Sequence, residues 1–302
     1  MADGGPVVAA YKAGAKLSQA VPDSFVGPLS RAAGFGFGQA MRGRRELLAR
    51  HLRRVHGPEL KGIALRRAVD QAFDSYARYW VESFRIPALS NVEIAAHFTH
   101  EGLGNLRKGI ADGTGVILAL PHLGGWEWAG RWIADCGWPI TVIVEPLEPP
   151  ELFEWFADYR RSLGMEVVPL GPGAAAAAIK AVKANGVLCL LCDRDIGGGG
   201  VEVEFFGERT TLPAGPATIA LRTGAPVLPT AVYFRPNGGH LGKVGAPLDV
   251  TRHGSMSEDV ASITQQLAHR LEDLIRLAPE QWHMLQPNWP SDPGYSAERE
   301  RP

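Results

Sequence analysis

Cysteine is scarce in this chain, and its scarcity argues against a disulfide framework. The 302 residues contain only 3 cysteines, which are Cys136, Cys189 and Cys192. A small, odd number of cysteines without the spacing of a secreted scaffold predicts reduced thiols. Because Cys189 and Cys192 fall inside an apolar run, we expect them to pack in the core rather than to bind a metal.

Long hydrophobic runs and an excess of one charge are also missing. No stretch reaches the roughly 20 apolar residues of a membrane-spanning helix, and the first residues lack the basic-then-apolar pattern of a signal peptide. Lys and Arg number 31 against 32 Asp and Glu, for a formal net charge of −1, so there is no overall attraction to nucleic acid. We expect a cytoplasmic protein, either soluble or peripherally attached to a membrane.

Two classes of hydrolytic enzyme lack their signatures. No Gly-x-Ser-x-Gly elbow is present, which disfavours a serine hydrolase. No second histidine follows His122 at helical spacing, which disfavours a zinc enzyme. The expected chemistry therefore uses neither a metal nor a resident cofactor.

No low-complexity linker divides the chain, so residues 1–302 are expected to form one domain. Its N-terminal helices, over residues 1–60, are a candidate membrane-associating element. Within them, residues 44–55 predict an amphipathic helix that carries a leucine stripe among arginines. Such a helix either lies on an anionic membrane or buries its leucines in the core. The glycine-rich, apolar residues 24–42 allow two interpretations as well, a packed helix pair or a surface that touches lipid.

The rest of the chain alternates short apolar runs with helical patterns. Strands are expected at 94–98, 116–120, 139–145, 166–170, 187–192, 202–206 and 226–234. Helices are expected at 64–85, 103–112, 125–136, 150–163, 174–185, 214–223 and 257–277, before a closing tail at 281–302. This alternation predicts an α/β fold with a central, mostly parallel sheet flanked by helices.

His122 follows the buried strand 116–120 directly, after Pro121. Open α/β sheets place their ligands at the carboxyl ends of their strands, so His122 is a candidate catalytic base. Glu127 follows within the next helix, where a carboxylate is able to approach the imidazole and set its tautomer. This spacing alone also fits a strand-end histidine that bonds a carbonyl, with Glu127 solvated.

A second strand ends in Asp193-Arg194-Asp195, followed by Ile196 and four glycines. Charges at this position belong to the same sheet edge as His122. We expect Asp193 to accept a hydrogen bond from the imidazole and Arg194 to bind an anionic group. A salt-bridged loop is the alternative interpretation.

Glu145 closes a third strand, and Arg160 lies in the helix that follows it. If both face one cleft, they are expected to pair with each other and to hold a phosphate or a sugar hydroxyl. A purely structural ion pair is equally compatible with the sequence.

Together these motifs resemble the bacterial lipid A acyltransferase superfamily, which is related to the glycerolipid acyltransferases. Within it, the resemblance is strongest to the mycobacterial enzymes that acylate phosphatidylinositol mannosides, and it covers residues 45–290. The motifs that carry it are Pro121-His-Leu-Gly-Gly-Trp-Glu127, Asp193-Arg-Asp195, Phe205-Phe-Gly-Glu208, Pro213-Ala-Gly-Pro-Ala217, Ser75-Tyr-Ala-Arg-Tyr-Trp80, Tyr159-Arg160, Ser162-Leu-Gly164 and Trp282-His-Met-Leu-Gln-Pro287.

The resemblance implies a glycerolipid-acyltransferase-like fold and transfer of a fatty acyl group from acyl-CoA to a mannose hydroxyl at the inner face of the plasma membrane. His122 would be the general base, and Glu145 and Arg160 would contact the acceptor. The mycobacterial enzyme has a glutamate where Asp193 stands and an aspartate where Glu127 stands. Which of these two carboxylates orients His122 stays open at this point. In this view, the helix at 44–55 is favoured as an element that faces an anionic membrane.

Other parts of the site are expected from chemistry. The oxyanion formed in the reaction needs donors, and the backbone amides past Pro213 or near Gly124 are candidates. An acyl chain needs an apolar tunnel, for which the candidates are Trp126, Trp128, Trp132 and Phe206. Three alternatives remain: acylation of another lysolipid or glycolipid, thioester hydrolysis, and non-catalytic lipid binding on the same fold.

Overall fold

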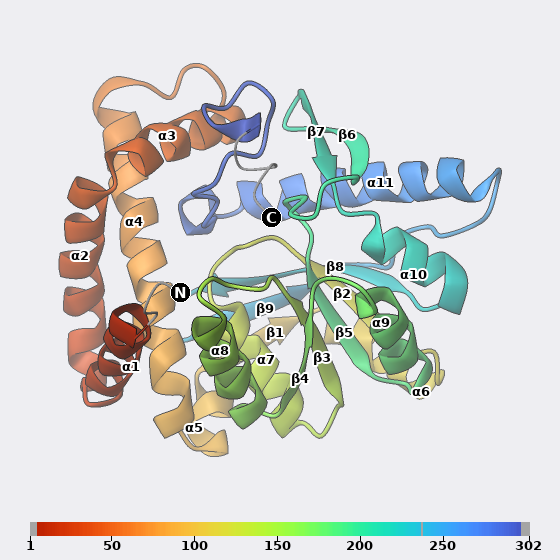
Figure 1. The fold of residues 1–302 in the computed structure, drawn as a ribbon, viewed down its shortest axis with the longest axis horizontal. Helices are drawn as coiled ribbons and strands as arrows, with labels where there is room; N and C mark the ends of the chain where they lie inside the picture. The colour runs from red at the N-terminus through yellow and green to blue at the C-terminus, as the bar shows by residue number, and fades with distance from the viewer. Residues whose placement is uncertain (1–4, 237, 297–302) are drawn as a thin grey trace.

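Helices and strands alternate through most of the chain (Figure 1). The computed structural model describes residues 5–236 and 238–296. Its α-helices are α1 (Gly5–Gln19), α2 (Asp23–Ala40), α3 (Arg42–His56), α4 (Gly62–Arg85), α5 (Asn91–Ala96), α6 (Leu103–Ala111), α7 (Trp126–Asp135), α8 (Pro150–Ser162), α9 (Ala174–Lys183), α10 (Gly215–Thr223) and α11 (Met256–Arg276). Its strands are β1 (Phe98–Glu101), β2 (Val116–Leu120), β3 (Ile140–Val144), β4 (Met165–Pro169), β5 (Val187–Leu191), β6 (Val201–Phe205), β7 (Glu208–Leu212), β8 (Val227–Phe234) and β9 (His240–Val244). Two short 3-10 helices are η1 (Ile86–Ala88) and η2 (Pro279–Gln281).

A seven-stranded sheet lies at the centre, in the order β1-β9-β8-β2-β5-β3-β4. Neighbouring strands pair in parallel except β8 and β9, which are antiparallel. The predicted α/β fold with a mostly parallel sheet is therefore confirmed. The strand expected at 202–206 is real, but its assignment to this sheet is wrong. It is β6, which pairs antiparallel with β7 in a separate hairpin because the turn at Phe206 and Gly207, with φ of +52° and +73°, returns the chain directly alongside it.

Both faces of the sheet are covered. On β2, Ile117 and Ala119 belong to a core that also contains residues of α9, α10 and α11. Leu118 and Leu120 point to the other face and pack with residues of α6, α7 and α8. Burial on both faces explains why these strands have continuous apolar sequences rather than alternating ones.

One local prediction is wrong. Residues 94–98 are not a strand, because Ser90 and Glu93 form a capping box that starts helix α5 instead. Strand β1 begins only at Phe98. It pairs with β9, a short strand that the sequence pattern did not predict.

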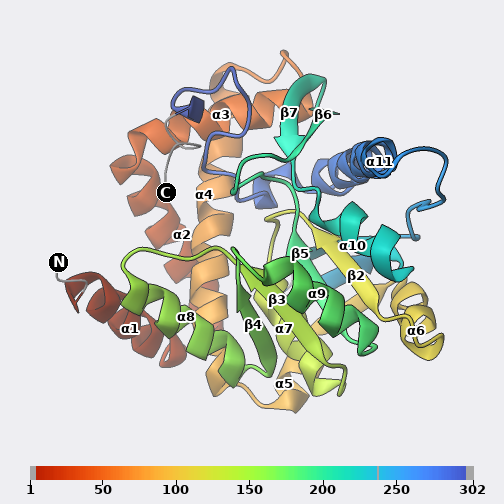
Figure 2. The same ribbon diagram turned by 45° about the vertical axis from the view of Figure 1, so that its right-hand side comes forward.

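The four N-terminal helices stand at one end of the molecule, where α2 runs along α4 (Figure 1). Helix α1 lies beside α8, which both views show (Figures 1 and 2). Residues 24–40 lie in the single helix α2 and α3 begins at Arg42, so the expected helix pair is not formed within this stretch. Gly34 allows α2 to approach Asp74 of α4 closely. On α3, the leucines of the predicted stripe, Leu48 and Leu52, are buried against α4.

Large apolar side chains remain exposed on the outer side of α1 and α2. They are Val7, Leu17, Phe25, Leu29, Phe35 and Phe37, which we call the N-terminal apolar surface. Phe25 and Phe35 are the most exposed aromatic residues of this surface, at 61% and 69%. In the described part of the chain, no helix combines the length and the apolar character needed to cross a membrane.

Candidate active site

The carboxyl ends of three neighbouring strands meet at one edge of the sheet. Strands β2 and β5 are paired in parallel with Leu120 opposite Leu191, so the residues that follow them also lie side by side. This register brings His122, just past β2, next to Asp193, just past β5. Strand β3 is the next neighbour and places Glu145 at the same edge. The topology thus explains why residues distant in sequence converge here.

His122 and Asp193 are in direct contact. The Nδ1 atom of His122 lies 2.6 Å from Oδ1 of Asp193, and the His122 amide donates to Oδ2 at 2.9 Å. A carboxylate at Nδ1 selects the tautomer that carries its proton there, so Nε2 holds the free lone pair. His122 borders a cavity, described below, and its side chain is 23% exposed. Asp193 is fully buried behind the His122 ring.

Asp193 is ionised in this environment. Burial on its own would raise the pKa of its carboxyl group, but the His122 ring, the Trp282 indole and the His122 amide together lower this pKa below its usual value. The indole Nε1 of Trp282 donates to Oδ2 of Asp193 at 2.7 Å. These donors keep Asp193 charged, and a buried carboxylate next to the ring stabilises an imidazolium formed during a reaction.

Glu127 does not contact His122. Its carboxylate is held by Arg160, with Oε1 at 2.6 Å from Nη2 and 3.0 Å from Nε, and it accepts a hydrogen bond from the Tyr79 hydroxyl. Burial would lower the pKa of Arg160, yet Glu127 raises it above its usual value, so the guanidinium stays charged. Helix α7 starts at Trp126, one residue later than expected, and Glu127 in its first turn faces Arg160 of α8.

Glu145 pairs with Arg194, and the expected pair of Glu145 with Arg160 is not formed. The Nη2 atom of Arg194 lies 3.5 Å from Oε1 of Glu145. The Glu145 side chain is 39% exposed, so it remains accessible from the cavity. The site therefore contains two acid–arginine pairs in place of one, Glu127 with Arg160 and Glu145 with Arg194.

His122 and both acid–arginine pairs border one cavity of about 700 Å³, whereas Asp193 and Trp282 do not line it. Away from the polar groups its wall is apolar and extends beneath α7 toward the far strands of the sheet, where Leu118, Val232 and Val244 line it. Of the aromatic residues expected around an acyl chain, Trp126 and Trp132 line this cavity. The other two expected residues are not among its lining.

Trp128 and Phe206 instead belong to the packed core. Trp128 donates from its indole to the Ile94 carbonyl at 3.1 Å and stacks on His240. Phe206 packs against Trp282 in the turn of the β6–β7 hairpin. Their aromatic character reflects packing, so their prediction as tunnel residues is wrong.

Of the two expected sets of oxyanion donors, the amides near Gly124 are already occupied. Gly124 adopts a φ of +62° and comes so close to the Val232 carbonyl that a side chain would collide with it. Its amide donates to the Gln281 carbonyl and the Gly125 amide to the Val232 carbonyl, so both are occupied. The first turn of α10, by contrast, borders the cavity with Gly215.

Asp195 and the glycines beside it shape the cavity wall. The Oδ2 atom of Asp195 accepts hydrogen bonds from the Gly200 amide and the Thr211 hydroxyl, both at 3.0 Å. These bonds fasten the start of the β6–β7 hairpin. Residues 197–200 are all glycines, so they line the cavity with backbone atoms alone. They leave room in the same cavity that His122 borders.

His283 is a cavity residue that the sequence analysis did not single out for a role. Its Nε2 lies 3.0 Å from the Ser75 hydroxyl, and its Nδ1 has no hydrogen-bond partner among the described residues. Burial and the nearby His122 lower the pKa of His283 to about 3, so it is neutral at physiological pH. The sequence signal that could have identified His283 is the Trp282-His283 motif, because this motif contributed to the family resemblance.

The described residues contain no group of three or more His, Cys, Asp or Glu side chains arranged to hold a metal ion. Cys189 and Cys192 line the cavity, and burial raises the pKa of the Cys189 thiol to about 12. Thiols that stay protonated do not act as nucleophiles.

Comparison with known proteins adds a family to this geometry. The family model described as bacterial lipid A biosynthesis acyltransferase matches residues 7–291. A phosphatidylinositol mannoside acyltransferase of Mycolicibacterium smegmatis is 38% identical over 288 residues, which are 93% of this chain and 91% of the relative. A protein of the same name from Mycobacterium tuberculosis (strain CDC 1551 / Oshkosh) is 42% identical over 226 residues, 73% of this chain and 70% of the relative.

Proposed function

This chain belongs to the bacterial lipid A biosynthesis acyltransferase family and is an acyltransferase, and from this premise we propose that it transfers a fatty acyl group from acyl-CoA to a mannose hydroxyl of a phosphatidylinositol mannoside. The resemblance found in the motifs is thereby confirmed at the level of the family. The observation that carries the proposal is the 2.6 Å contact between His122 and Asp193 at the edge of a large apolar cavity.

In the proposed reaction His122 is the general base. Its Nε2 removes the proton of the acceptor hydroxyl while the oxygen attacks the thioester carbonyl, and a tetrahedral intermediate forms. The C–S bond then breaks, the imidazolium returns the proton to the sulfur, and CoA leaves as the thiol. Asp193 holds the ring and stabilises the imidazolium throughout, as the carboxylate of a catalytic triad does. An unperturbed imidazole has a pKa near 6.5, which suits this work at neutral pH.

The polar wall of the cavity suits a sugar acceptor. Glu145, which is partly exposed, and the Glu127–Arg160 pair present oxygen and nitrogen atoms on the same side as His122. Hydroxyl groups of a mannose ring donate to carboxylates and accept from guanidinium groups. Arg194, which borders the same space, is suited to an anionic group of either substrate.

The apolar wall suits the acyl chain. A saturated chain gains about 0.8 kcal/mol for each methylene group removed from water, and the cavity beneath α7 offers continuous apolar side chains. At the start of α10 the Gly215 amide would donate to the oxyanion, and the helix dipole there favours negative charge. Pro216 has no N–H, and the Thr218 amide already donates to the Ala214 carbonyl. Each part of the proposed intermediate thus has a complementary surface in one cavity.

The proposed acceptor resides in a membrane, so the enzyme has to reach one. We place the membrane contact, at the inner face of the plasma membrane, on the N-terminal apolar surface of α1 and α2. The arginines of α3 are less available than the sequence suggested. Arg54 is only 12% exposed and pairs with Glu208 and Asp292. Arg50 and Arg53 are more exposed and are suited to attract anionic lipids, although Arg50 also pairs with Glu46.

A mass-resolved transfer assay tests this proposal. Palmitoyl-CoA is offered with a phosphatidylinositol mannoside, and separately with water alone. We expect an acylated glycolipid that disappears in His122→Ala but persists in His269→Ala, which removes an exposed histidine of α11. Release of free fatty acid alone would replace the transfer proposal by thioester hydrolysis. Donor binding without turnover would point to a lipid-binding protein, and activity of His122→Ala close to wild type would refute the proposed base.

A further inference from the structure

The segment after η2 lies directly against the backbone around His122. Leu123 and Trp282 form an antiparallel bridge. The His283 amide donates to the His122 carbonyl at 2.7 Å, and the Gly124 amide donates to the Gln281 carbonyl at 2.9 Å. This short ladder places the Trp282 side chain behind the pair of His122 and Asp193, on the side away from the cavity.

Trp282 is fully buried, and its indole N–H takes part in the carboxylate network of Asp193. Oδ2 of Asp193 receives the indole and the His122 amide, while Oδ1 faces the His122 ring. Rotation of the carboxylate would break at least one of these bonds. The indole therefore helps to determine which oxygen faces the imidazole.

Asn288 supplies a second contact from the same segment to the same residue. The side-chain Nδ2 of Asn288 donates to the Asp193 carbonyl at 2.8 Å, and the backbone amide of Asn288 donates to Oδ2 of Asp292 at 2.9 Å. The Thr210 hydroxyl of the β6–β7 hairpin donates to the Asn288 carbonyl. Asp193 is thus held by its carboxylate and by its backbone from one C-terminal segment.

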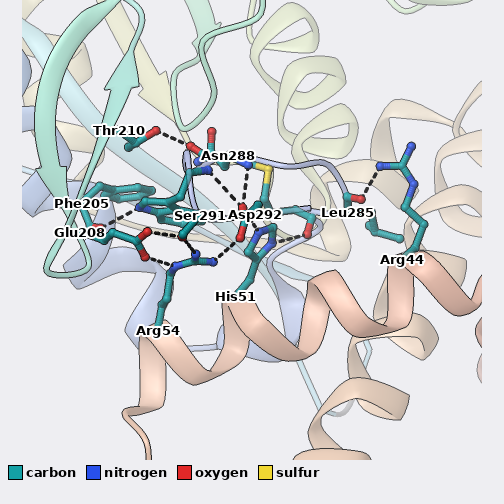
Figure 3. Close-up of polar contacts among 12 residues, drawn as sticks. Arg44, His51, Arg54, Phe205, Glu208, Thr210, Leu285, Asn288, Ser291 and Asp292 are labelled. Atoms are coloured by element: carbon teal, nitrogen blue, oxygen red, sulfur yellow. Dashed lines mark hydrogen bonds and ion pairs between the residues drawn. The ribbon is translucent and has the colours of Figure 1, made fainter. Parts of the chain in front are cut away.

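Helix α3 anchors this segment from the other side (Figure 3). The ring of His51 lies between the Met284 carbonyl, 2.9 Å from Nδ1, and Asp292 Oδ2, 3.0 Å from Nε2. Arg54 forms an ion pair with Asp292 at 2.8 Å, and its guanidinium covers the ring of Trp289 at 4.2 Å. His51 and Asp292 are fully buried and Arg54 is nearly so, and Arg54 adds a charged pair, so these contacts hold the segment firmly in one position.

We propose that Trp282 is a positioning residue for acyl transfer: its indole N–H holds the Asp193 carboxylate in the orientation that keeps Nδ1 of His122 protonated and Nε2 free to accept the proton of the acceptor. The inference rests on the proposed role of His122 as the base. It adds a donor at the carboxylate end of the pair, and it gives the C-terminal segment a part in the chemistry.

The chain offers a matched control. Trp289 is also fully buried and belongs to the same segment, but its indole donates to the Phe205 carbonyl, away from the site. Trp282→Phe and Trp289→Phe each remove one indole N–H and comparable volume. A merely structural role for Trp282 predicts that the two variants behave alike.

We expect Trp282→Phe to lower kcat about tenfold or more with little change in KM, because one hydrogen bond to a charged group is lost. A carboxylate without the indole donor holds the imidazolium proton more tightly. The rising limb of the pH–rate profile should then move up by about 1 pH unit, since a charged hydrogen bond is comparable in free energy to one unit of pKa. Trp289→Phe should leave this limb in place.

A second variant and a second readout guard against a simple loss of folding. Benzothienylalanine at position 282 keeps the ring shape and lacks only the N–H group, and it should shift the limb in the same direction. Histidine ring ¹⁵N spectra report the tautomer and the titration of His122 without any substrate, with His122→Ala to assign the signal. If Trp282→Phe and Trp289→Phe match in both the pH limb and these spectra, the positioning role is refuted.

These measurements separate the inference from the function on which it rests. If His122→Ala keeps its activity, the base assignment fails, and the pH limb no longer reports on Trp282. If His122→Ala is inactive while the Trp282 variants titrate like wild type, only the positioning role fails. A shifted titration in the spectra together with a shifted limb supports both.

Discussion

The Nη2 atom of Arg160 lies 2.6 Å from Oε1 of Glu127, and this contact separates the two carboxylates that stand near His122. Glu127 is committed to Arg160 and the Tyr79 hydroxyl, whereas Asp193 is committed to the imidazole. A carboxylate bound at two positions by a buried guanidinium is not available to orient a histidine. The geometry therefore favours Asp193 as the partner of the base and leaves Glu127 to the acceptor side of the cavity.

This division predicts different kinetic defects for two isosteric substitutions. Asp193→Asn should lower kcat by about 10³-fold or more, because an amide supports the wrong tautomer of His122. Glu127→Gln should raise KM for the acceptor and leave kcat within about tenfold, because that carboxylate contacts no reacting atom in the proposed mechanism. Steady-state kinetics with varied acceptor concentration at saturating donor measure both effects.

Folding has to be checked alongside, since Glu127→Gln leaves the Arg160 charge buried without its partner. A loss of about 3 kcal/mol in the free energy of unfolding is expected for a broken buried ion pair. The assay temperature is therefore chosen below the onset of unfolding for both variants. Equal losses of kcat in the two variants would mean that both carboxylates serve the base, contrary to the geometry.

The central strands of the sheet, such as β2 and β8, were predictable because they are buried on both faces and have continuous apolar sequences. The hairpin of β6 and β7 was not, since β6 alternates buried and exposed side chains and gives no sign of the sheet that it joins. Strand β9 was missed for a related reason, because it alternates as well and is short. Local pattern thus identified most of the strands but missed β7 and β9 and assigned β6 to the wrong sheet.

The composition of the active site and its His122–Asp193 pair were predictable, but its acid–arginine pairs were not. Strand ends located His122, Asp193 and Glu145, because parallel topology collects such positions at one edge. The partners of Glu127 depend on where α7 starts and on how α8 packs, which no spacing encodes. Trp282 donates to Asp193 across 89 residues of sequence, so its role emerges only once the chain is folded.

His283 should make the free energy of unfolding depend on pH over a range in which the carboxylates contribute little. Its pKa is about 3 in the folded protein, below the usual 6.5, so the unfolded chain binds one more proton between these values. Stability is therefore complete above about pH 6.5 and falls as the pH decreases, by about 1.4 kcal/mol per pH unit for this one group. His283→Gln should remove that slope between pH 6.5 and about 4.5, as measured by urea denaturation at fixed pH values.

His269→Gln is the control for this series, because it changes an exposed histidine in α11. It should keep the wild-type dependence on pH. The carboxylates with lowered pKa, such as Asp193, contribute stability that is lost only as the pH falls below about 4, outside the window. A His283→Gln slope that matches wild type would show that the ring is already charged, or free to become so, in the folded protein.

The N-terminal apolar surface should carry binding to lipid vesicles. Replacing Phe25 and Phe35 together by Ser removes two exposed aromatic side chains, each able to contribute about 1.5–3 kcal/mol when withdrawn from water. We expect at least a tenfold weaker partition onto vesicles that contain anionic phospholipid, in a co-sedimentation assay. Turnover of a detergent-solubilised acceptor should change little, because neither residue lines the cavity.

Val92→Ser with Leu277→Ser is the matched control, since these side chains are 77% and 61% exposed on other parts of the molecule. This pair should bind vesicles like wild type. Reversal of charge at Arg50 and Arg53 should weaken binding only to anionic vesicles and less so in high salt, because screening acts on charge alone. Vesicle binding that survives the loss of both phenylalanines would move the membrane contact to another surface.

The far end of the apolar cavity should limit the length of the acyl chain. From His122 the lining runs across β2 and β8 to β9, where Val244 faces the same side of the sheet as Leu118 and Val232. Val244→Phe adds bulk at that end and should favour shorter donors. Four methylene groups are worth about 3 kcal/mol of burial, so kcat/KM for a palmitoyl donor should fall at least tenfold relative to a dodecanoyl donor in direct competition.

Val92→Phe, the same substitution on an exposed side chain of α5, should leave the ratio unchanged. An unchanged ratio in Val244→Phe would mean that the chain occupies a different branch of the cavity, beside α9 and α10.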